Sequence, residues 1–445
     1  MATDLRLLTY RTVCFAESVL ARFFRVGDRS VVTTLEAAFR FGWDELRSSR
    51  ERRSLLLFAA TIGEFNAVKS LMARCRQIWP NDHFIILAGQ AQYLEALHAA
   101  NPDAVIGTPN IRAPWLWDRF IAISRPRLAI FAEGPSLHCR FPVRSELSLP
   151  LTLLRHRVPL VVANARVYEL KLHDSRRHRL EHHFFRDLFT RAVWHWYAPS
   201  ESFYRDLVAA GAPADRITVV GDLKFDVASQ SRDAPDEELA RILERYRKSP
   251  GPTVVAGSVN AVDERNAVIE AWLALRARHP GARLVLAPRY VNKVDLMEPL
   301  YSDLQTLGYD FQRRSRLKPG SDLPGILVID VFGELGHFYG IATIGYVGRN
   351  HGLLEPLSHG APTVAGPGWH QTHPSYPLYE QLVAAGAVIQ VSEFDALGNI
   401  FLRILDEPAW ADKYLEAARQ TIAENSGATG RIAASLQELS KEPPA

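Results

Sequence analysis

The sequence contains little that would support a disulfide framework, a cysteine metal site or a membrane span. Its 445 residues include three cysteines, which are far apart and form no CxxC pair (Cys14, Cys75 and Cys139). This scarcity argues against a disulfide scaffold and a structural zinc site, and it favours a reducing, cytoplasmic compartment. No apolar run is long enough to cross a bilayer, and charges recur from Arg6 to Arg22, where a signal peptide would need an uncharged core.

An excess of charge of one sign is also missing. Lys and Arg number 52 against 49 Asp and Glu, so the formal net charge is +3. This near balance gives no electrostatic reason to expect a nucleic-acid partner. The sequence also lacks a Walker loop, a GxGxxG turn after a strand, a GxSxG elbow, an HExxH motif and a clear DxD motif after a strand. Their absence argues against the ATPase, dinucleotide, hydrolase and zinc-protease chemistries, and against metal-dependent sugar transfer.

The sequence does have a repeated alternation of apolar strands and amphipathic helices, which predicts parallel α/β sheets. In the first half, strands are expected at Leu55–Ala60, His83–Ala88, Leu128–Ala132, Leu160–Ala163, Trp196–Pro199 and Ile217–Val220. In the second half they are expected at Thr253–Ala256, Arg283–Ala287, Gly325–Ile329, Ile344–Val347 and Pro362–Ala365. A long helix, Trp410–Glu438, follows the last strand.

A charged stretch between the two halves, with prolines near both ends, indicates a linker that contains a polar helix. We therefore expect an N-terminal segment at 1–54, an α/β domain at 55–228, the linker at 229–251 and a second α/β domain at 252–445. A cleft is expected between the domains, because ligands of such sheets bind at the carboxyl ends of the strands.

The N-terminal segment has an apolar helical face between Leu5 and Phe24, followed by the basic stretch Arg47–Arg53. This helix could pack on its own domain or lie on a membrane surface, and the basic stretch could be solvated or contact anionic head groups.

Glu64 follows the first strand and begins a helix. There the helix dipole favours the charged form, so the carboxylate is expected to be ionised and placed to accept a proton. A helix-capping role is the alternative.

Two basic residues follow strands further along the chain. Lys224, in the segment GDLKFD, could neutralise an anion or pair with Asp222 or Asp226. Arg289, in the segment PRY, could hold a phosphate or carboxylate, or be solvated.

Two glycine-containing turns lead from strands into helices in the second half. Backbone N–H groups at Gly333 and Glu334 could hold a phosphate, and Glu355, after the turn Gly348–Gly352, could accept hydrogen bonds from ribose hydroxyls. Such turns also occur without a ligand.

Taken in order, these segments resemble the transferases of 3-deoxy-D-manno-octulosonic acid (Kdo), which move Kdo from CMP-Kdo to lipid A precursors. The motifs that match are Thr61–Glu64, Asn164–Arg166, Gly221–Asp226, Gly257–Asn260 with Asp263 and Glu264, Pro288–Tyr290, Asp330 with Gly333–Leu335 and Tyr339, Glu355–Pro356 and Gly366–Pro367. The matches cover most of the chain.

The sequence departs from the family pattern in three places. A threonine-rich loop is replaced by Ala88–Ala91, an acidic segment is shortened to Glu133–Pro135, and the turn before His351 is shorter, with Gly352 in place of asparagine. The first two changes fall on the acceptor side and the third on the donor side, so another acceptor or another CMP-linked ulosonic acid stays open.

The resemblance implies a GT-B fold of two Rossmann-like domains and an inverting transfer without a metal or other cofactor. Glu64 would be the catalytic base. The donor would contact Lys224, Ser258, Arg289, Gly333, Glu334, Asn350, His351 and Glu355, and the acceptor side would hold Gly63, Glu133, Asn164 and Arg166. The implied partners are a CMP-activated donor and a lipid A precursor or related glycan, on the cytoplasmic face of the inner membrane. A UDP-sugar transferase or 2-epimerase of the same fold, or a silent binding protein in envelope assembly, are the alternatives.

Overall fold

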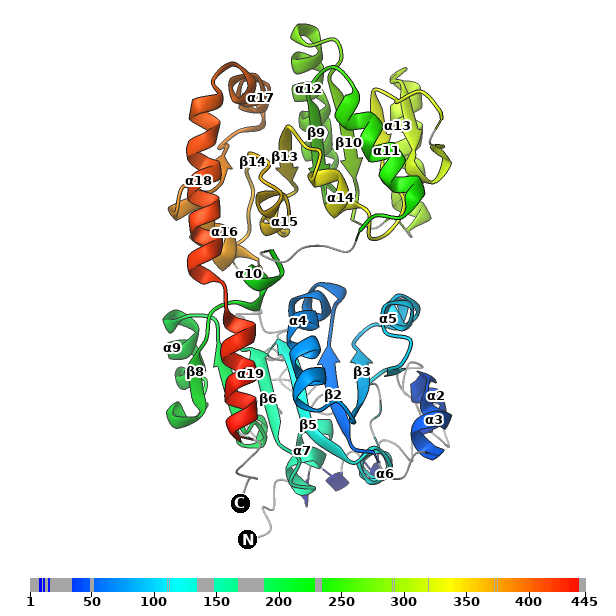
Figure 1. The fold of residues 1–445 in the computed structure, drawn as a ribbon, viewed down its shortest axis with the longest axis vertical. Coiled ribbons are helices and arrows are strands. Elements are labelled where there is room, and N and C mark those ends of the chain that lie inside the picture. The colour runs from blue at the N-terminus through cyan, green and yellow to red at the C-terminus, as the bar shows by residue number, and fades with distance from the viewer. Residues whose placement is uncertain are drawn as a thin grey trace. The chain divides into compact units, whose positions relative to one another are not determined.

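The computed structural model shows two α/β units (Figure 1). It describes residues 8–9, 11–12, 15–16, 34–48, 52–109, 111, 113–133, 148–166, 188–228, 234–289, 291, 293–318, 320–371, 373 and 375–439. The first unit comprises Met1–Val227 together with Asn425–Ala445, and the second comprises Ala228–Glu424. The predicted α/β fold class is therefore confirmed.

The first unit is built on an eight-stranded sheet with the order β1-β4-β3-β2-β5-β6-β7-β8. All neighbouring strands are parallel except β1, which runs antiparallel to β4. The strands are β1 (Phe39–Phe41), β2 (Ser54–Ala59), β3 (His83–Ala88), β4 (Val105–Gly107), β5 (Pro126–Glu133), β6 (Leu160–Asn164), β7 (His195–Ala198) and β8 (Ile217–Val219).

Helices cover both faces of this sheet, which is why its strands are apolar at consecutive positions. On β2, Leu56 belongs to one buried cluster, whereas Leu55 and Leu57 belong to the cluster on the opposite face. The helices are α2 (Leu35–Ala38), α3 (Trp43–Ser48), α4 (Ile62–Ile78), α5 (Leu94–Ala100), α6 (Pro114–Ser124), α7 (Ser148–Arg155), α9 (Glu201–Ala209), α10 (Leu223–Ala228) and α19 (Ala428–Leu439).

The second unit is built on a seven-stranded parallel sheet with the order β11-β12-β10-β9-β13-β14-β15. Its strands are β9 (Thr253–Gly257), β10 (Arg283–Ala287), β11 (Phe311–Arg313), β12 (Ile326–Val328), β13 (Ile344–Val347), β14 (Thr363–Ala365) and β15 (Ile389–Gln390). Its helices are α11 (Glu237–Lys248), α12 (Val262–Arg278), α13 (Val294–Thr306), α14 (Leu335–Tyr339), α15 (Leu354–Ser358), α16 (Tyr376–Ala384), α17 (Leu397–Asp406) and α18 (Pro408–Asn425).

Both sheets reverse the direction in which strands are added. In the first sheet, β3 and β4 follow β2 on one side, and the chain then returns to place β5 on the other side of β2. In the second sheet, β10 and β12 lie on one side of β9 and β13 lies on the other. Loops diverge where strand order reverses, so open α/β sheets bind ligands at the carboxyl ends of these strands.

The C-terminal region differs from the prediction of one helix within the second domain. The helix ends at Asn425 and a new one starts at Ala428, because Gly427 has a φ of 96° that interrupts the helical path. Ile432 and Leu436 of α19 join the buried cluster of the first sheet. The predicted domain 252–445 therefore needs correction, since its last residues (425–445) belong to the first unit.

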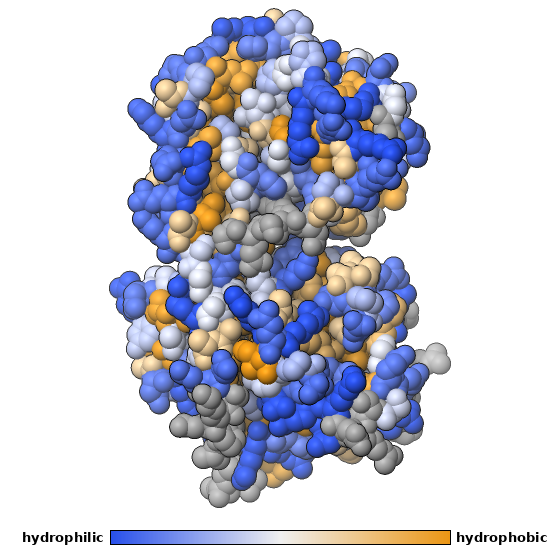
Figure 2. Space-filling view, viewed as in Figure 1, coloured by the Kyte–Doolittle hydropathy of each residue, from blue (hydrophilic) through white to orange (hydrophobic). Residues whose placement is uncertain are grey.

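Much of the predicted N-terminal helix 5–24 lies outside the described residues. Of its described part, Arg11 pairs with Asp118 at 2.7 Å, and Phe15 packs edge-on against Trp115 of α6. Hydrophobic side chains are scattered among hydrophilic ones on the face shown in Figure 2. Within the described ranges, no helix is both long and apolar enough to cross a membrane.

Candidate active site

Glu64 lies in the first turn of α4, directly after β2 at the reversal of the first sheet. Its backbone N–H donates to the Thr61 hydroxyl at 3.2 Å, and its carboxylate accepts from the backbone N–H of Ala60 at 2.8 Å. This arrangement is close to a capping box, in which a helix-start hydroxyl and acid satisfy free backbone donors. The capping alternative therefore describes an interaction that Glu64 does make, and the same contacts fix the position of its carboxylate.

The protonation of Glu64 differs from the sequence expectation. Burial, followed by the nearby carboxylate of Glu133, raises its pKa to about 7, although the Ala60 N–H and Lys224 act in the opposite direction. The expectation of full ionisation at neutral pH took only the helix dipole into account. It was wrong, because burial and the charge of Glu133 raise the pKa of Glu64 by more than the dipole lowers it. A carboxyl group with a pKa near 7 can exchange a proton with a substrate at physiological pH.

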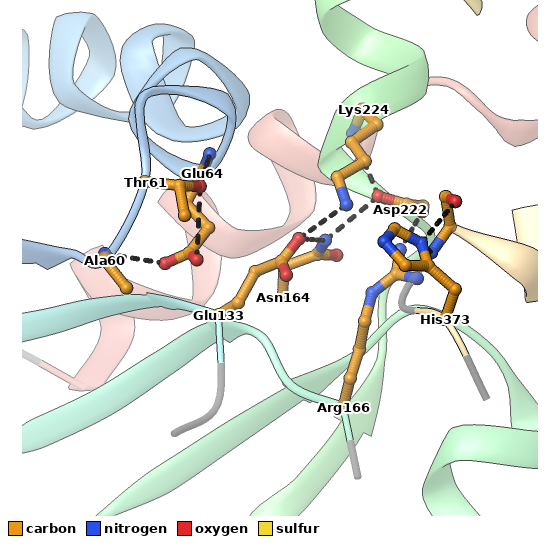
Figure 3. Close-up of polar contacts among 10 residues, drawn as sticks. Ala60, Thr61, Glu64, Glu133, Asn164, Arg166, Asp222, Lys224 and His373 are labelled. Atoms are coloured by element: carbon orange, nitrogen blue, oxygen red, sulfur yellow. Dashed lines mark hydrogen bonds and ion pairs between the residues drawn. The ribbon is translucent and has the colours of Figure 1, made fainter. Parts of the chain in front are cut away.

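Glu133 occupies the carboxyl end of β5, across the strand reversal from Glu64, and its residue is 7% exposed. Its Oε1 lies 2.7 Å from Nζ of Lys224 and 3.4 Å from the amide nitrogen of Asn164 (Figure 3). Lys224 thus pairs with Glu133 and not with Asp226, one of the partners that the sequence suggested. The ammonium group therefore neutralises the charge of the Glu133 carboxylate.

Asp222 anchors the other side of this network. It forms a buried ion pair with Arg166, accepts from the Asn164 amide at 3.0 Å and accepts from the Lys224 backbone N–H at 3.0 Å. Burial alone would raise the pKa of Asp222, but Arg166 and Lys224 outweigh burial and lower it. Arg166 is 1% exposed and stacks over the Phe203 ring, so in this arrangement it is a positioning residue.

A second polar cluster lies at the carboxyl edge of the second sheet, around its strand reversal. Asn260, after β9, accepts from the Arg289 backbone N–H at 2.9 Å and donates to the Ser258 carbonyl at 3.1 Å. The Arg289 guanidinium lies 2.6 Å from Nδ1 of His351, and the Asn260 amide nitrogen lies 3.1 Å from its Nε2. Residues after β9, β10 and β13 therefore meet in one cluster with Arg289 exposed at its surface.

His351 is held neutral in this cluster. Burial, followed by the charge of Arg289, lowers its pKa to about 3. A neutral imidazole accepts only one hydrogen bond, yet nitrogen donors face both of its ring nitrogens. An anion that binds Arg289 would provide that guanidinium with a stronger acceptor than the imidazole.

Glu264 fixes the turn that carries His351. Its Oε1 accepts from the Tyr346 hydroxyl at 2.8 Å and from the Arg349 backbone N–H at 2.9 Å. The residue is 1% exposed, and burial raises its pKa. Asn350, with a φ of 67°, also holds this turn, because its side chain accepts from the His370 backbone N–H at 2.7 Å.

The remaining predicted donor residues lie nearby in the fold but have other interactions. The Glu334 carboxylate accepts a hydrogen bond from Arg314 at 2.6 Å. Glu334 is also the N-cap of α14, which is five residues long, and Gly333 before it has a φ of 87°. Glu355 lies in the first turn of α15, which packs against α14. Gly63 is exposed in the first turn of α4 beside Glu64.

Asn260, Glu264 and Arg314 belong to these arrangements but were not assigned roles from the sequence. Asn260 and Glu264 stand inside a segment that resembles a family motif, so the motif was a usable signal for them. Arg314 is 5% exposed and contacts Glu238 and Glu334, and no local pattern marks it. Among the described residues, no group of three or more His, Cys, Asp or Glu side chains is placed to hold a metal ion.

The two Rossmann-like units define a GT-B fold. A UDP-N-acetylglucosamine 2-epimerase from Neisseria meningitidis, solved with UDP-GlcNAc, superposes with a TM-score of 0.55 over 83% of this chain and 98% of that chain, at 12% identity. At this identity the likeness concerns the fold alone.

The sequence comparisons all point to similarity with one family. Residues 36–227 match the model of the 3-deoxy-D-manno-octulosonic-acid transferases. The transferase of that name from Haemophilus influenzae is 25% identical over 413 residues, which cover 89% of each chain. The one from Bordetella pertussis is 31% identical over 240 residues, which cover 51% of this chain and 53% of its own. The chain is therefore similar to the Kdo transferases over most of its length, and these similarities indicate a glycosyltransferase.

The raised pKa of Glu64 can be tested without an activity assay. Between an ordinary glutamate pKa of 4.5 and about 7, the folded state binds more protons than the unfolded state, so Glu64 lowers stability as pH rises. Glu64→Gln keeps an acceptor for the Ala60 N–H but has no charge. We expect its Tm, relative to the unchanged protein, to increase between pH 5 and pH 8.

The exposed Glu95→Gln, which removes a charge from the same unit, is the control and should show no such trend. A Tm difference for Glu64→Gln that stays constant across this pH range would mean that Glu64 has an ordinary pKa.

Proposed function

We propose that this chain transfers a Kdo-like ulosonic acid from a CMP-linked donor to a lipid A precursor or related glycolipid, with inversion at the anomeric carbon. The observation that carries the proposal is the pair Glu64 and Glu133 at the reversal of the first sheet, with Lys224 on Glu133. This arrangement leaves the Glu64 carboxyl group with a pKa of about 7. It suits a general base that serves an incoming hydroxyl.

In this reaction Glu64 accepts the proton of the acceptor hydroxyl as its oxygen attacks the anomeric carbon. The bond between that carbon and the CMP phosphate oxygen breaks, and the leaving phosphate takes the bonding electron pair. The pKa of about 7 matters here, because a stronger acid would be a weaker base and a weaker acid would be protonated at neutral pH. Glu133 contributes by raising this pKa, and Lys224 limits the increase.

The second unit would bind the donor. Arg289 lies exposed in the cluster with His351 and Asn260, and a guanidinium there can neutralise the charge that develops on the leaving phosphate. Glu264 would keep the turn before His351 in place through its bond to the Arg349 backbone. The helix start at Gly333 and the carboxylate of Glu355 remain proposed contacts for the phosphate and the ribose.

We also propose that the first unit contacts the membrane that holds a glycolipid acceptor. Phe15 is 56% exposed and lies 5.4 Å, between ring centroids, from Trp115, which is 41% exposed. Leu8 and Leu154 are further exposed apolar side chains in the same unit. Exposed aromatic rings near cationic side chains suit the interface between water and lipid.

Glu64→Gln is expected to lower turnover with CMP-Kdo and a lipid A precursor on the order of a hundredfold or more, the scale for loss of a general base. In the unchanged protein, kcat/KM should rise with pH through about 7 and then level, because Glu64 acts when deprotonated. In Glu133→Gln, the rise of kcat/KM with pH should occur at lower pH, because the carboxylate of Glu133 raises the pKa of Glu64. Mass spectrometry of the product and a pH–rate profile measure both effects, with Glu95→Gln as the control. Unchanged turnover in Glu64→Gln would remove the residue from this role.

Arg289→Gln is expected to weaken CMP binding about 10- to 100-fold, because a charge-assisted hydrogen bond to the phosphate is lost. Isothermal titration with CMP and with UDP measures this, and the exposed Arg278→Gln on α12 provides a control of equal charge change. Tighter binding of UDP than of CMP by the unchanged protein would instead support a UDP-sugar enzyme. Bound CMP without any donor turnover would support a silent binding protein.

The membrane contact predicts that Trp115→Ala reduces co-sedimentation with vesicles of phosphatidylglycerol and phosphatidylethanolamine several-fold. The ring would otherwise bury apolar surface at the interface. Leu307→Ala, an exposed apolar residue of the second unit, is the matched control. Equal sedimentation of the two variants and the unchanged protein would contradict the proposed contact surface.

A further inference from the structure

A cavity of about 300 Å³ lies at the amino edge of the first sheet, the edge opposite Glu64 and Glu133. Its walls come from the residues that precede three adjacent parallel strands: Arg53 before β2, Arg125 before β5, and His156 and Arg157 before β6. Apolar and proline residues of α6 and of the starts of β5 and β6 complete the lining. The strands therefore separate this cavity from the proposed catalytic residues.

The described residues that line the cavity include three arginines and one histidine but no Asp or Glu. Two acids have ion pairs beside the lining residues: Asp118 lies 2.9 Å from His156 and also pairs with Arg155 and Arg11, while Asp82 pairs with Arg127. Burial, and the positive charges of Arg127 and Arg125, lower the pKa of Arg53 although Asp82 acts in the opposite direction. The cavity is thus a site of concentrated positive charge.

Two of these arginines stand in backbone conformations that favour glycine. Arg125 is the C-terminal cap of α6 with a φ of 46°, and Arg157 follows α7 with a φ of 55°. After α7, the Arg157 N–H donates to the Leu154 carbonyl, and the next N–H, of Val158, donates to Leu153. Such left-handed helix ends are usually glycine, since a side chain there costs conformational free energy.

This conformational cost occurs twice, before two neighbouring strands, at residues that line one cavity. A backbone strain that recurs where charges converge is a reason to look for a function at that place. Stability alone would favour glycine at both positions.

We infer that this cavity binds the phosphate group of a phosphoanion. Guanidinium groups match phosphate oxygens in pairs, and a volume of about 300 Å³ is at the lower end of small-molecule sites. The phosphate could come from an anionic lipid head group or from a soluble phosphoester. The inference is independent of the proposed transfer reaction, because it uses none of the residues assigned to that reaction.

The decisive variant is the double substitution Arg125→Gly and Arg157→Gly in the full chain. Glycine fits both backbone conformations, so the Tm should stay equal or rise, whereas the affinity for glycerol 1-phosphate should fall at least tenfold. Arg53→Gln should weaken binding by a similar factor without any backbone change. Arg40→Gln, which removes an exposed charge elsewhere in the same unit, is the control and should bind normally.

Two binding experiments distinguish a lipid head group from a soluble phosphoester as the source of the phosphate. Isothermal titration measures binding of glycerol 1-phosphate, and flotation measures binding to phosphatidylglycerol vesicles. Loss of both kinds of binding in the double variant assigns the cavity to a lipid head group. Loss of glycerol 1-phosphate binding alone assigns it to a soluble phosphoester. The inference is overturned if the unchanged protein binds neither probe, or if the double variant binds both as well as the unchanged protein. A fall in Tm with normal binding would mean that the arginines serve the fold.

Discussion

Each sheet reverses its strand order at an internal strand, β2 in the first unit and β9 in the second, and this constraint determines where chemistry can take place in both units. The reversal between β2 and β5 brings Glu64 and Glu133 to one edge, although 69 positions separate them. The reversal between β9 and β13 does the same for Ser258 and His351. The strands on either side are apolar on both faces and buried, so they hold these ends rigidly while the polar side chains remain at the edge.

The carboxyl edges of the two sheets differ in the charged groups that they hold. In the first unit, two acids and one lysine share a small volume, and burial makes one carboxyl group hold its proton up to about pH 7. In the second unit, Arg289 lies beside the His351 imidazole, which burial keeps neutral. Arg289 therefore gives this cluster a positive charge that can attract an anion. The one arrangement suits an exchange of protons and the other suits a phosphate. The transfer proposed above would use both.

The strands that position these residues were predicted from the sequence, because an apolar run that ends at a glycine or a charged residue is visible in a short stretch of sequence. It missed β1, β4, β11 and β15, which have two or three residues each and are too short to show a period. Glu64, Asn164 and Lys224 were found through motifs, but the contacts of Glu133 with Lys224 and Asn164 were not predicted, since pairing depends on residues distant in the chain. The pKa of Glu64 needed burial and Glu133, neither of which a helix-start pattern contains. The return of α19 to the first unit was also invisible, because its apolar face could pack equally well on either sheet.

That return makes the second unit an insertion within the first. The chain leaves the first unit at Val227 and re-enters it at Asn425, and Asp226 then accepts from the backbone N–H groups of Gly427 and Thr429 at the start of α19. A fragment cut at residue 227 would lack α19, which packs against α4, and would expose apolar side chains of the cluster that Ile432 and Leu436 complete. Evolution or engineering can therefore exchange the second unit most cleanly as a cassette between two cut sites, and not as a C-terminal tail.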